Sequence, residues 1–457
     1  MLTLSKTHHS APAHSLLITL FWGVLFVGIK LGILGLGTVG TGTVQLLQDN
    51  VGRHSLLQLV EIHRVGVKSL DKPRDVTLPK SVITTDLESI VNDPEIDIVV
   101  ELIGGLEPAR ELILKAIQNG KHVVTANKAV ISRFGAEIFT LANRQGVYVM
   151  LEAAVGGGIP VIQPLKQSLS VNRIHTVTGI VNGTTNYILT RMQTEGSSFD
   201  AVLADAQKLG YAEADPTADV DGWDAADKIS ILASLAFGGR INREEVSCEG
   251  IRQISKTDIT YANNLGFVIK LLAIAKKVSP TDCTLSVRVH PTLVPKTHPL
   301  ANINGVYNAI LIEGEPLGQV MFFGPGAGAG ATASAVSSDI LNLVARLQKG
   351  EISSPLDPLL GCSHQDYCTI ASQSELTARF YTRFLTKDQP GVIGKLGTSF
   401  GKHGVSLESI VQTGFQDKLA EIVVVTHDVK EGDFKQAVEE IRTFEAIDSI
   451  PSSVRVL

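Results

Sequence analysis

Cysteine is scarce in this sequence. The four cysteines among 457 residues follow no regular spacing and stand at Cys248, Cys283, Cys362 and Cys368. Sparse, irregular cysteines favour a reducing compartment over a disulfide framework, so we expect a cytoplasmic protein. His364 lies between Cys362 and Cys368, but a structural zinc site needs four ligands and no second Cys/His pair is close by in the sequence. We therefore expect no zinc there.

An excess of positive charge is also missing. The net charge is −6 and no basic tract stands out, which argues against nucleic acid as a partner. The apolar run from Ser15 to Ile29 falls short of the ~20 residues that span a bilayer. No small-x-small cleavage motif precedes Lys30. We expect residues 1–28 to be an extension outside the fold, without stable membrane insertion; a signal-anchor is the alternative.

A chain of this length exceeds one compact core, so two or three domains are expected. The stretch "KLGILGLGTVG" gives an apolar strand, Lys30 to Leu34, followed by a glycine motif and a helical pattern to Leu47. Such a loop lets the backbone and the helix N-terminus approach a pyrophosphate. A glycine-rich turn without function is the alternative. The cofactor contacts expected from this loop are Gly35, Leu36, Gly37, Thr38, Val39 and Gly40.

The second strand, around Glu61 to Val67, is followed by Lys68. An enzyme that uses NAD usually has an acidic residue here for the ribose 2′-hydroxyl, whereas a 2′-phosphate needs positive partners. Lys68 therefore favours NADP, with NAD still possible and ordinary surface charge as the alternative. Apolar runs without alternation continue to about residue 155 and predict an α/β, Rossmann-type, doubly wound parallel sheet covered on both faces.

Six carboxylates precede one lysine in "LGYAEADPTADVDGWDAADK", residues 209–228. The helical pattern that starts near Gly222 places Asp224 and Lys228 one turn apart on one face. A solvated acidic loop with a helical salt bridge would also fit this pattern. A calcium loop is excluded because, counted from Asp215, Val220 and Ala226 occupy the positions that need glycine and glutamate.

Several separated motifs, in a fixed order, resemble homoserine dehydrogenases from about Lys30 to the C-terminus. They are "GLGTVG", "TANK", "EAAVGGGIP", "GIVNGTTNYIL", the acidic stretch and "GPGAGAGATASAVSSDI". The resemblance implies reversible NAD(P)-dependent oxidation of L-homoserine to L-aspartate 4-semialdehyde, in the biosynthesis of threonine, methionine and isoleucine. A non-catalytic amino-acid sensor is the alternative. No aspartokinase segment is present.

The resemblance also implies roles for individual residues. Lys228 is the expected proton donor and acceptor, supported by Asp224, and Lys128 of "TANK" is the second lysine at the site; which of the two takes the proton stays open. The expected substrate contacts are Glu213, Asp219 and Asp224. Further expected cofactor contacts are Gly104, Lys128, Gly210 and Gly328. A monovalent cation, sodium, is expected at Glu152, Val155, Gly157 and Ile159, where glycines acting as plain hinges are the alternative.

The last 82 residues, 376–457, follow a βαββαβ order, that of a ferredoxin-like unit. They resemble an ACT domain, which implies feedback inhibition by threonine; a module for oligomerisation alone is the alternative. Effector contacts are expected at Asp388, Gly391, Gly404 and Ser406. The expected domains are 29–155 completed by 321–350 for the nucleotide, 156–320 as an α+β catalytic and dimerisation domain, and 376–457. A homodimer or homotetramer is expected.

Overall fold

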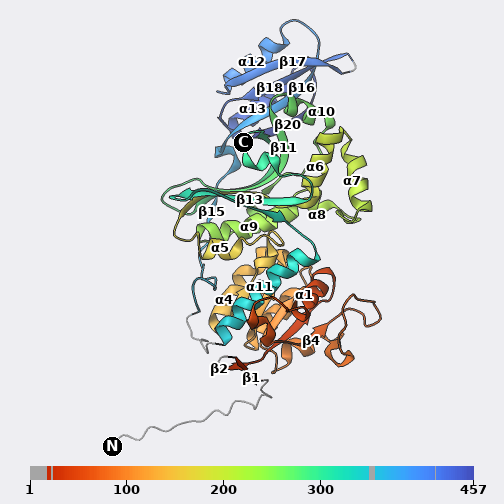
Figure 1. The fold of residues 1–457 in the computed structure, drawn as a ribbon. Helices are drawn as coiled ribbons and strands as arrows, with labels where there is room; N and C mark the ends of the chain where they lie inside the picture. Colours follow the sequence, from red (N-terminus) through yellow and green to blue (C-terminus); the bar gives the residue numbers. More distant parts are fainter. Residues whose placement is uncertain (1–17, 22–23, 349–355, 417) are drawn as a thin grey trace, which may run out of the picture.

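The computed structural model describes residues 18–21, 24–348, 356–416 and 418–457. Figure 1 shows three tiers along one axis: a nucleotide domain at the bottom, a middle domain built on a large sheet, and a C-terminal domain at the top. Within residues 1–28, the described strands β1 (Ile18–Phe21) and β2 (Val24–Val27) pair with each other in a separate two-stranded sheet. No helix among the described residues is long and apolar enough to cross a membrane.

The nucleotide domain contains a six-stranded sheet in the order β5-β4-β3-β6-β7-β8. Every pairing in it is parallel. This strand order, with the first strand in the middle, is that of a dinucleotide-binding fold. The doubly wound prediction is therefore confirmed. The strands are β3 (Ile29–Leu34), β4 (Val60–Gly66), β5 (Ile83–Thr84), β6 (Ile98–Glu101), β7 (His122–Thr125) and β8 (Val149–Met150).

The central strands β6 and β7 of this sheet are buried on both faces, which explains their apolar runs. On β6, Val100 packs in one core with Val44, while its neighbour Val99 packs in another core with Ile113. Helices α1 (Thr38–Gln48) and α11 (Ala329–Leu347) form the first layer, and α2 (Leu87–Asn92), α3 (Ala109–Gln118) and α4 (Lys128–Gln145) contribute to the second core. Helix α11 returns from far along the chain, so this domain is discontinuous.

The middle and C-terminal domains share one 12-stranded sheet. Its main path is β14-β13-β9-β11-β12-β20-β16-β18-β17, in which the first five strands belong to the middle domain. Helix α9 (Trp223–Phe237) packs on β9, β11 and β12, and α6 (Gly183–Glu195) packs on β11 and β13. Strand β14 stays in this sheet to Pro325, so the return to the nucleotide domain begins after that residue. The middle strands are β9 (Arg173–Ile180), β11 (Phe267–Lys277), β12 (Thr284–Pro295), β13 (Tyr307–Glu315) and β14 (Gly318–Pro325).

The C-terminal domain has the predicted βαββαβ order, but its sheet is not separate. The last strand pairs in parallel with β12, where Thr292 lies opposite Arg455 and Leu293 opposite Val456. Val454 and Val456 belong to the same core as the middle domain. The elements are β16 (Thr377–Lys387), α12 (Val392–Lys402), β17 (Leu407–Gln416), β18 (Leu419–Thr426), α13 (Glu431–Arg442) and β20 (Ile447–Val456).

One disulfide joins Cys283 and Cys368, a bond that the cysteine spacing did not predict. Strand β15 (Thr369–Ile370) runs beside β12, and this pairing brings the two cysteines together although 85 residues separate them in sequence. Sequence spacing could not reveal this bond, because it holds no information about which strands pair. Cys248 and Cys362 are free thiols.

Candidate active site

The acidic stretch ends in helix α9, which carries the predicted Asp224–Lys228 pair. Gly222 caps the helix with φ of +86°, a conformation that glycine adopts at no steric cost. One turn apart on α9, the Lys228 ammonium donates to Asp224 Oδ2 at 2.6 Å, and it also donates to the Val181 carbonyl at 2.7 Å. The two side chains are only 12% and 11% exposed. The structure therefore holds this ion pair in a nearly closed setting.

Lys128 approaches the same carboxylate from the nucleotide domain. It is the first residue of α4, whose N-terminus Asn127 caps by accepting from the Val130 amide at 3.2 Å. Lys128 Nζ lies 3.2 Å from Asp224 Oδ1, so each oxygen of Asp224 faces a different lysine. The Lys128 side chain is 38% exposed and leaves part of its ammonium accessible. The two domains thus meet at Asp224.

These contacts set the charge of the cluster. Burial opposes ionisation of Asp224, but the ammonium groups of Lys228 and Lys128 outweigh it and hold the pKa of Asp224 below its usual range. The negative charge of Asp224 in turn raises the pKa of Lys128 against the opposing effect of burial. At neutral pH the site therefore contains an ionised carboxylate and a Lys128 ammonium.

A second carboxylate, Asp219, joins the cluster through an amide that sequence reasoning missed. Asp219 lies on α8 (Thr217–Val220), and Asn182 Nδ2 donates to Asp219 Oδ1 at 2.7 Å and to Asp224 Oδ2 at 2.9 Å. Burial and the charge of Asp224 raise the pKa of Asp219. The available signal was the lone polar residue directly after an apolar strand, in "GIVNGTT".

The other carboxylates of the stretch lie apart from the two lysines. Glu213 is exposed, and Asp215 accepts from the Thr217 amide at 3.1 Å, as expected for a turn. Asp221 pairs with an arginine at 2.6 Å. Asp227 is not a surface charge: its side chain is 8% exposed and lies between Arg133 and Arg243.

The glycine loop lies at the edge where the parallel strands of the nucleotide domain end. A Cβ added at Gly40 would meet the Gly35 carbonyl oxygen at 2.1 Å, whereas one at Gly37 would meet nothing within 4 Å. Gly40 therefore permits close packing of helix and turn, and Gly37 leaves open space for a phosphate. Gly104 follows β6 at the same edge, and Lys128 follows β7. The loop before α11, which contains Gly328, touches α1 through Ala329 and Gly42.

A buried glutamate that the sequence analysis did not identify holds the loops that follow β6 and β7. Glu101 accepts from the amides of Ile103 and Gly104 at 3.0 and 3.2 Å and from the Thr125 hydroxyl at 2.6 Å. Burial raises the pKa of Glu101, although these donors oppose the shift. Glu101 thus connects the loop after β6 with the turn that leads to Lys128.

The basic residues after β4 divide into two kinds. Lys68 is exposed at the end of the strand, where a 2′-phosphate would lie by the usual geometry of this fold. Arg74 instead donates to the backbone carbonyls of Ser69 and Lys72 and shapes the loop itself. The Gly210 turn lies after α7 (Phe199–Lys208) in the middle domain, and its contact with a cofactor stays a prediction.

In the predicted cation loop, the Glu152 side chain binds backbone amides, whereas backbone carbonyl oxygens are left for a cation. The buried Glu152 carboxylate accepts three amides, those of Val161, Ile162 and Gln163, at 2.7–2.8 Å. Among the described residues, the carbonyl oxygens of Val155, Gly157 and Ile159 accept no hydrogen bond. Uncharged carbonyl oxygens are suitable ligands for a monovalent cation. No group of three or more His, Cys, Asp or Glu suited to a metal occurs in the described ranges.

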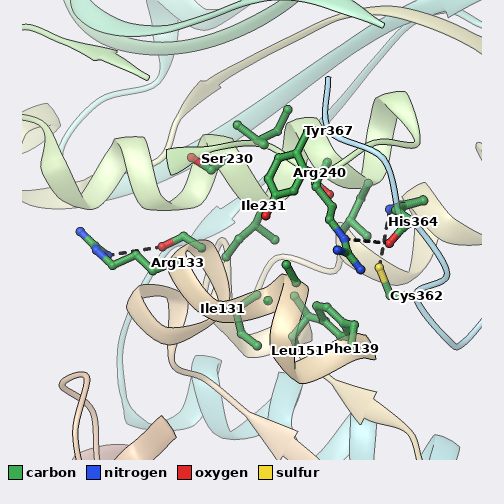
Figure 2. Close-up of a pocket in the computed structure, with 16 residues that line it drawn as sticks. Ile131, Arg133, Phe139, Leu151, Ser230, Ile231, Arg240, Cys362, His364 and Tyr367 are labelled. Carbon is green, nitrogen blue, oxygen red and sulfur yellow. Dashed lines mark hydrogen bonds between the residues drawn. The ribbon is translucent and has the colours of Figure 1, made fainter. Parts of the chain in front are cut away.

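A separate pocket lies further along α4 and α9 than Lys128 and Asp224. Figure 2 shows side chains that line it. Arg240 Nε donates to the His364 carbonyl at 2.9 Å, and Cys362 Sγ lies 3.6 Å from His364 Nδ1. Cys368 of the same segment is bonded to Cys283, so the three candidate zinc ligands do not form one site.

Of the four expected effector residues, two line a pocket in the C-terminal domain. Asp388 and Gly391 lie there with Gln412, at the N-terminus of α12. Gly404 and Ser406 follow the opposite end of that 11-residue helix and do not line the pocket. The helix separates two loops that the motif "DQPGVIGKLGTSFGKHGVSLESIVQ" presents as one stretch, and an effector contact at Gly404 and Ser406 stays a prediction.

Comparison with known proteins gives consistent results along the chain. Three family models match: homoserine dehydrogenase, NAD binding domain, at residues 35–152; homoserine dehydrogenase at 160–341; and ACT domain at 380–446. A homoserine dehydrogenase of Synechocystis sp. is 65% identical over 430 residues, which cover 94% of this chain and 99% of the relative. One of Bacillus subtilis is 40% identical, with coverage of 94% and 98%. The crystal structure of a homoserine dehydrogenase from Thiobacillus denitrificans superimposes with a TM-score of 0.87 at 39% identity, covering 94% of this chain and 99% of that one.

Proposed function

The chain belongs to the homoserine dehydrogenase family, and from this premise we propose how its NAD(P)-dependent oxidoreductase site works. The reaction is the reversible oxidation of L-homoserine to L-aspartate 4-semialdehyde, in the cytoplasm and in the biosynthesis of threonine, methionine and isoleucine. The observation that carries the proposal is the position of Asp224 between the ammonium groups of Lys228 and Lys128. When bound, the nicotinamide cofactor supplies the hydride acceptor.

The two lysines have different roles in this mechanism. The hydroxyl of the substrate must lose its proton while hydride leaves the carbon, so a base has to lie within hydrogen-bond reach. We assign this proton transfer to Lys228: its neutral amine takes the proton during oxidation, and the ammonium so formed, which Asp224 holds in a nearly closed setting, returns the proton in the reverse reaction. The raised pKa of Lys128 suits a permanent cation that stabilises negative charge on the reacting oxygen.

The carboxylates serve the other end of the substrate. Homoserine carries an ammonium group, and Asp219 and Asp224 present negative charge beside the lysines. Glu213 lies on the exposed loop before α8, from which it would close over the bound substrate. We assign it as a third contact to the ammonium group.

The test compares two lysine variants with a control. Lys228→Met should lower kcat by about 100-fold or more, because general acid–base catalysis contributes that much, while the Kd for NADPH stays within about twofold. Lys128→Met should also lower kcat. Lys276→Met, at an exposed lysine of β11, is the matched control and should keep full activity. A Lys228→Met enzyme that turns over normally would refute the assignment.

The proposed cofactor is NADP, with Lys68 as the partner of the 2′-phosphate. Its exposed position after β4 supports this choice. One solved relative, a hyperthermophilic archaeal homoserine dehydrogenase, is described in complex with NADPH. Lys68→Ala should raise KM for NADP by about tenfold and leave KM for NAD unchanged, since only NADP has the phosphate. Equal effects on both cofactors would contradict the proposal.

The proposed cation is sodium, held by backbone carbonyl oxygens of the loop that contains Val155, Gly157 and Ile159. Their lack of hydrogen-bond donors supports it. The Glu152 carboxylate shapes the loop by capping α5 (Ile162–Lys166) and contributes through its backbone. Thermal stability and activity in sodium, compared with choline at equal ionic strength, test this proposal. Identical values in both salts would refute it.

The proposed effector is threonine, bound in the C-terminal pocket. Asp388 offers a carboxylate for the ammonium group, and the first amides of α12 suit a carboxylate. Asp388→Asn should weaken threonine inhibition by about tenfold while uninhibited activity is kept. Removing residues 376–457 is a poor test, because β20 and its buried valines complete the middle domain.

The proposed assembly is a homodimer, with a homotetramer as the larger possibility. Strand β14 is an edge of the large sheet and exposes Met321 and Phe323, a pattern that favours pairing with a second copy. Sedimentation of Phe323→Lys should show a smaller species than the unmodified protein. An unchanged sedimentation coefficient would exclude this edge as the interface.

A further inference from the structure

Two buried carboxylates of the site, Asp219 and Asp224, share one hydrogen-bond donor. Asn182 is the only side chain in the described ranges that donates to both, at 2.7 and 2.9 Å. It lies two residues after the end of β9, next to Val181, whose carbonyl accepts from Lys228. Asn182 is 5% exposed, so water does not substitute freely for its amide.

The orientation of this amide is fixed by the other end of the side chain. Asn182 Oδ1 caps α6, where it accepts from the Thr185 amide at 2.9 Å and from the Thr185 hydroxyl at 2.9 Å. An amide flipped by 180° would point its nitrogen at a backbone N–H and its oxygen at two carboxylates. The cap therefore dictates that both amide hydrogens face Asp219 and Asp224.

Asn182 and Lys228 converge on the same oxygen, Asp224 Oδ2, while Lys128 faces Oδ1. This set of donors fixes the rotation of the Asp224 carboxylate. Because two neighbouring anions repel each other, Asp219 depends on donors to remain ionised, and Asn182 supplies one of them.

We propose that Asn182 is a positioning residue that keeps Asp219 ionised and aims Asp224 at Lys228, so that both carboxylates meet the substrate ammonium in one geometry. The proposal rests on the proposed function, because it presupposes that these carboxylates serve the substrate. It makes the N-cap of α6 and the substrate site a single unit: the same side chain starts the helix and orients the acids.

The test uses two substitutions that keep a cap. Asn182→Asp retains the cap acceptor and the size but replaces the donors with a third negative charge, and Asn182→Ser retains a cap with at most one donor. We expect KM for L-homoserine to rise about 10- to 100-fold in Asn182→Asp and less in Asn182→Ser, with the Kd for NADPH unchanged. The acidic limb of the kcat/KM profile should move to higher pH in Asn182→Asp, because the added charge favours protonation of its neighbours.

A purely structural role predicts a different result. Ser198→Ala, which removes the cap of the neighbouring helix α7, measures the cost of losing a cap without touching the acids. If the Asn182 variants show only a lower melting temperature, with unmodified KM and pH profile, the proposal is wrong. Failure of the proposed function appears separately, as normal turnover by Lys228→Met.

Discussion

Two groups of buried charges lie on the same large sheet, one at the catalytic end and one where the C-terminal domain joins. At the junction, Arg383 of β16 donates to Asp258 at 3.0 Å and to Glu421 at 2.7 Å. Tyr261 donates to the other oxygen of Glu421, and Ser452 donates to the same oxygen of Asp258 as Arg383. At the site, Asp224 is held by two lysines, one of which is 38% exposed. Both groups are buried acid–base clusters, yet their chemistry differs.

The difference lies in the cation. Arginine stays charged and donates in a fixed fork, so Arg383 has no proton to exchange, and at 5% exposure it is not accessible to a substrate. Lysine is a compact donor whose proton can leave, and Lys128 opens toward the expected substrate. Residue type and accessibility together therefore distinguish a cluster that holds domains together from one suited to chemistry; burial alone does not.

The largest expected effect comes from breaking the junction. Arg383→Met leaves two buried carboxylates unpaired and should lower the free energy of unfolding by about 3–5 kcal/mol, measured by urea denaturation. Arg379→Met is the matched control on the same strand, because its partner Glu408 is 43% exposed and such pairs contribute less than about 1 kcal/mol. Lys228→Met should cost activity but much less stability. Equal stability losses in all three variants would remove the distinction between the two clusters.

The next effect concerns a path between the two clusters. Arg455 of β20 holds Glu249 through two hydrogen bonds, at 2.8 and 2.9 Å. The residues beside Glu249 contact the turn before α9: Cys248 Sγ donates to the Asp221 carbonyl at 3.1 Å and the Ile251 amide donates to that of Val220 at 2.8 Å. A change at the C-terminal domain would therefore reach the backbone between Asp219 and Asp224.

If threonine inhibits as proposed, Glu249→Gln should weaken that inhibition by about tenfold and change uninhibited kcat less than twofold, because it loosens this link without touching the site. The measurement is the inhibitor concentration for half-activity at fixed substrate. Glu439→Gln, on the exposed side of α13, serves as the control. Full inhibition of Glu249→Gln would show that the effector signal takes another route.

The sequence predicted the elements and the family-specific cluster because both depend on short spacings. Helical periodicity placed Asp224 and Lys228 one turn apart, and the glycine loop followed its strand as expected. Contacts between distant segments were missed: the β12–β20 pairing, the Cys283–Cys368 bond and the arginines around Asp227. Asn182 and Glu101 were missed for a different reason. Each is a single polar residue at the end of an apolar strand, and the side chains that it contacts in the site are far away in sequence.

The smallest expected effect tests a third kind of buried group, one that stays neutral. His122 at the start of β7 accepts from the Tyr148 amide at 3.0 Å, and burial lowers the pKa of its imidazole to about 4. The unfolded chain, with an ordinary pKa near 6.5, binds the proton first, so stability is complete above that pH and falls as pH drops toward 4. Between pH 6.5 and 5.5 the free energy of unfolding should fall by about 1 kcal/mol from this residue. In His122→Asn the side-chain oxygen can accept from the same amide, and the free energy of unfolding, measured by denaturant titration, should vary less with pH across this range. An unchanged pH dependence would mean that His122 is protonated to the same extent in the folded and unfolded states.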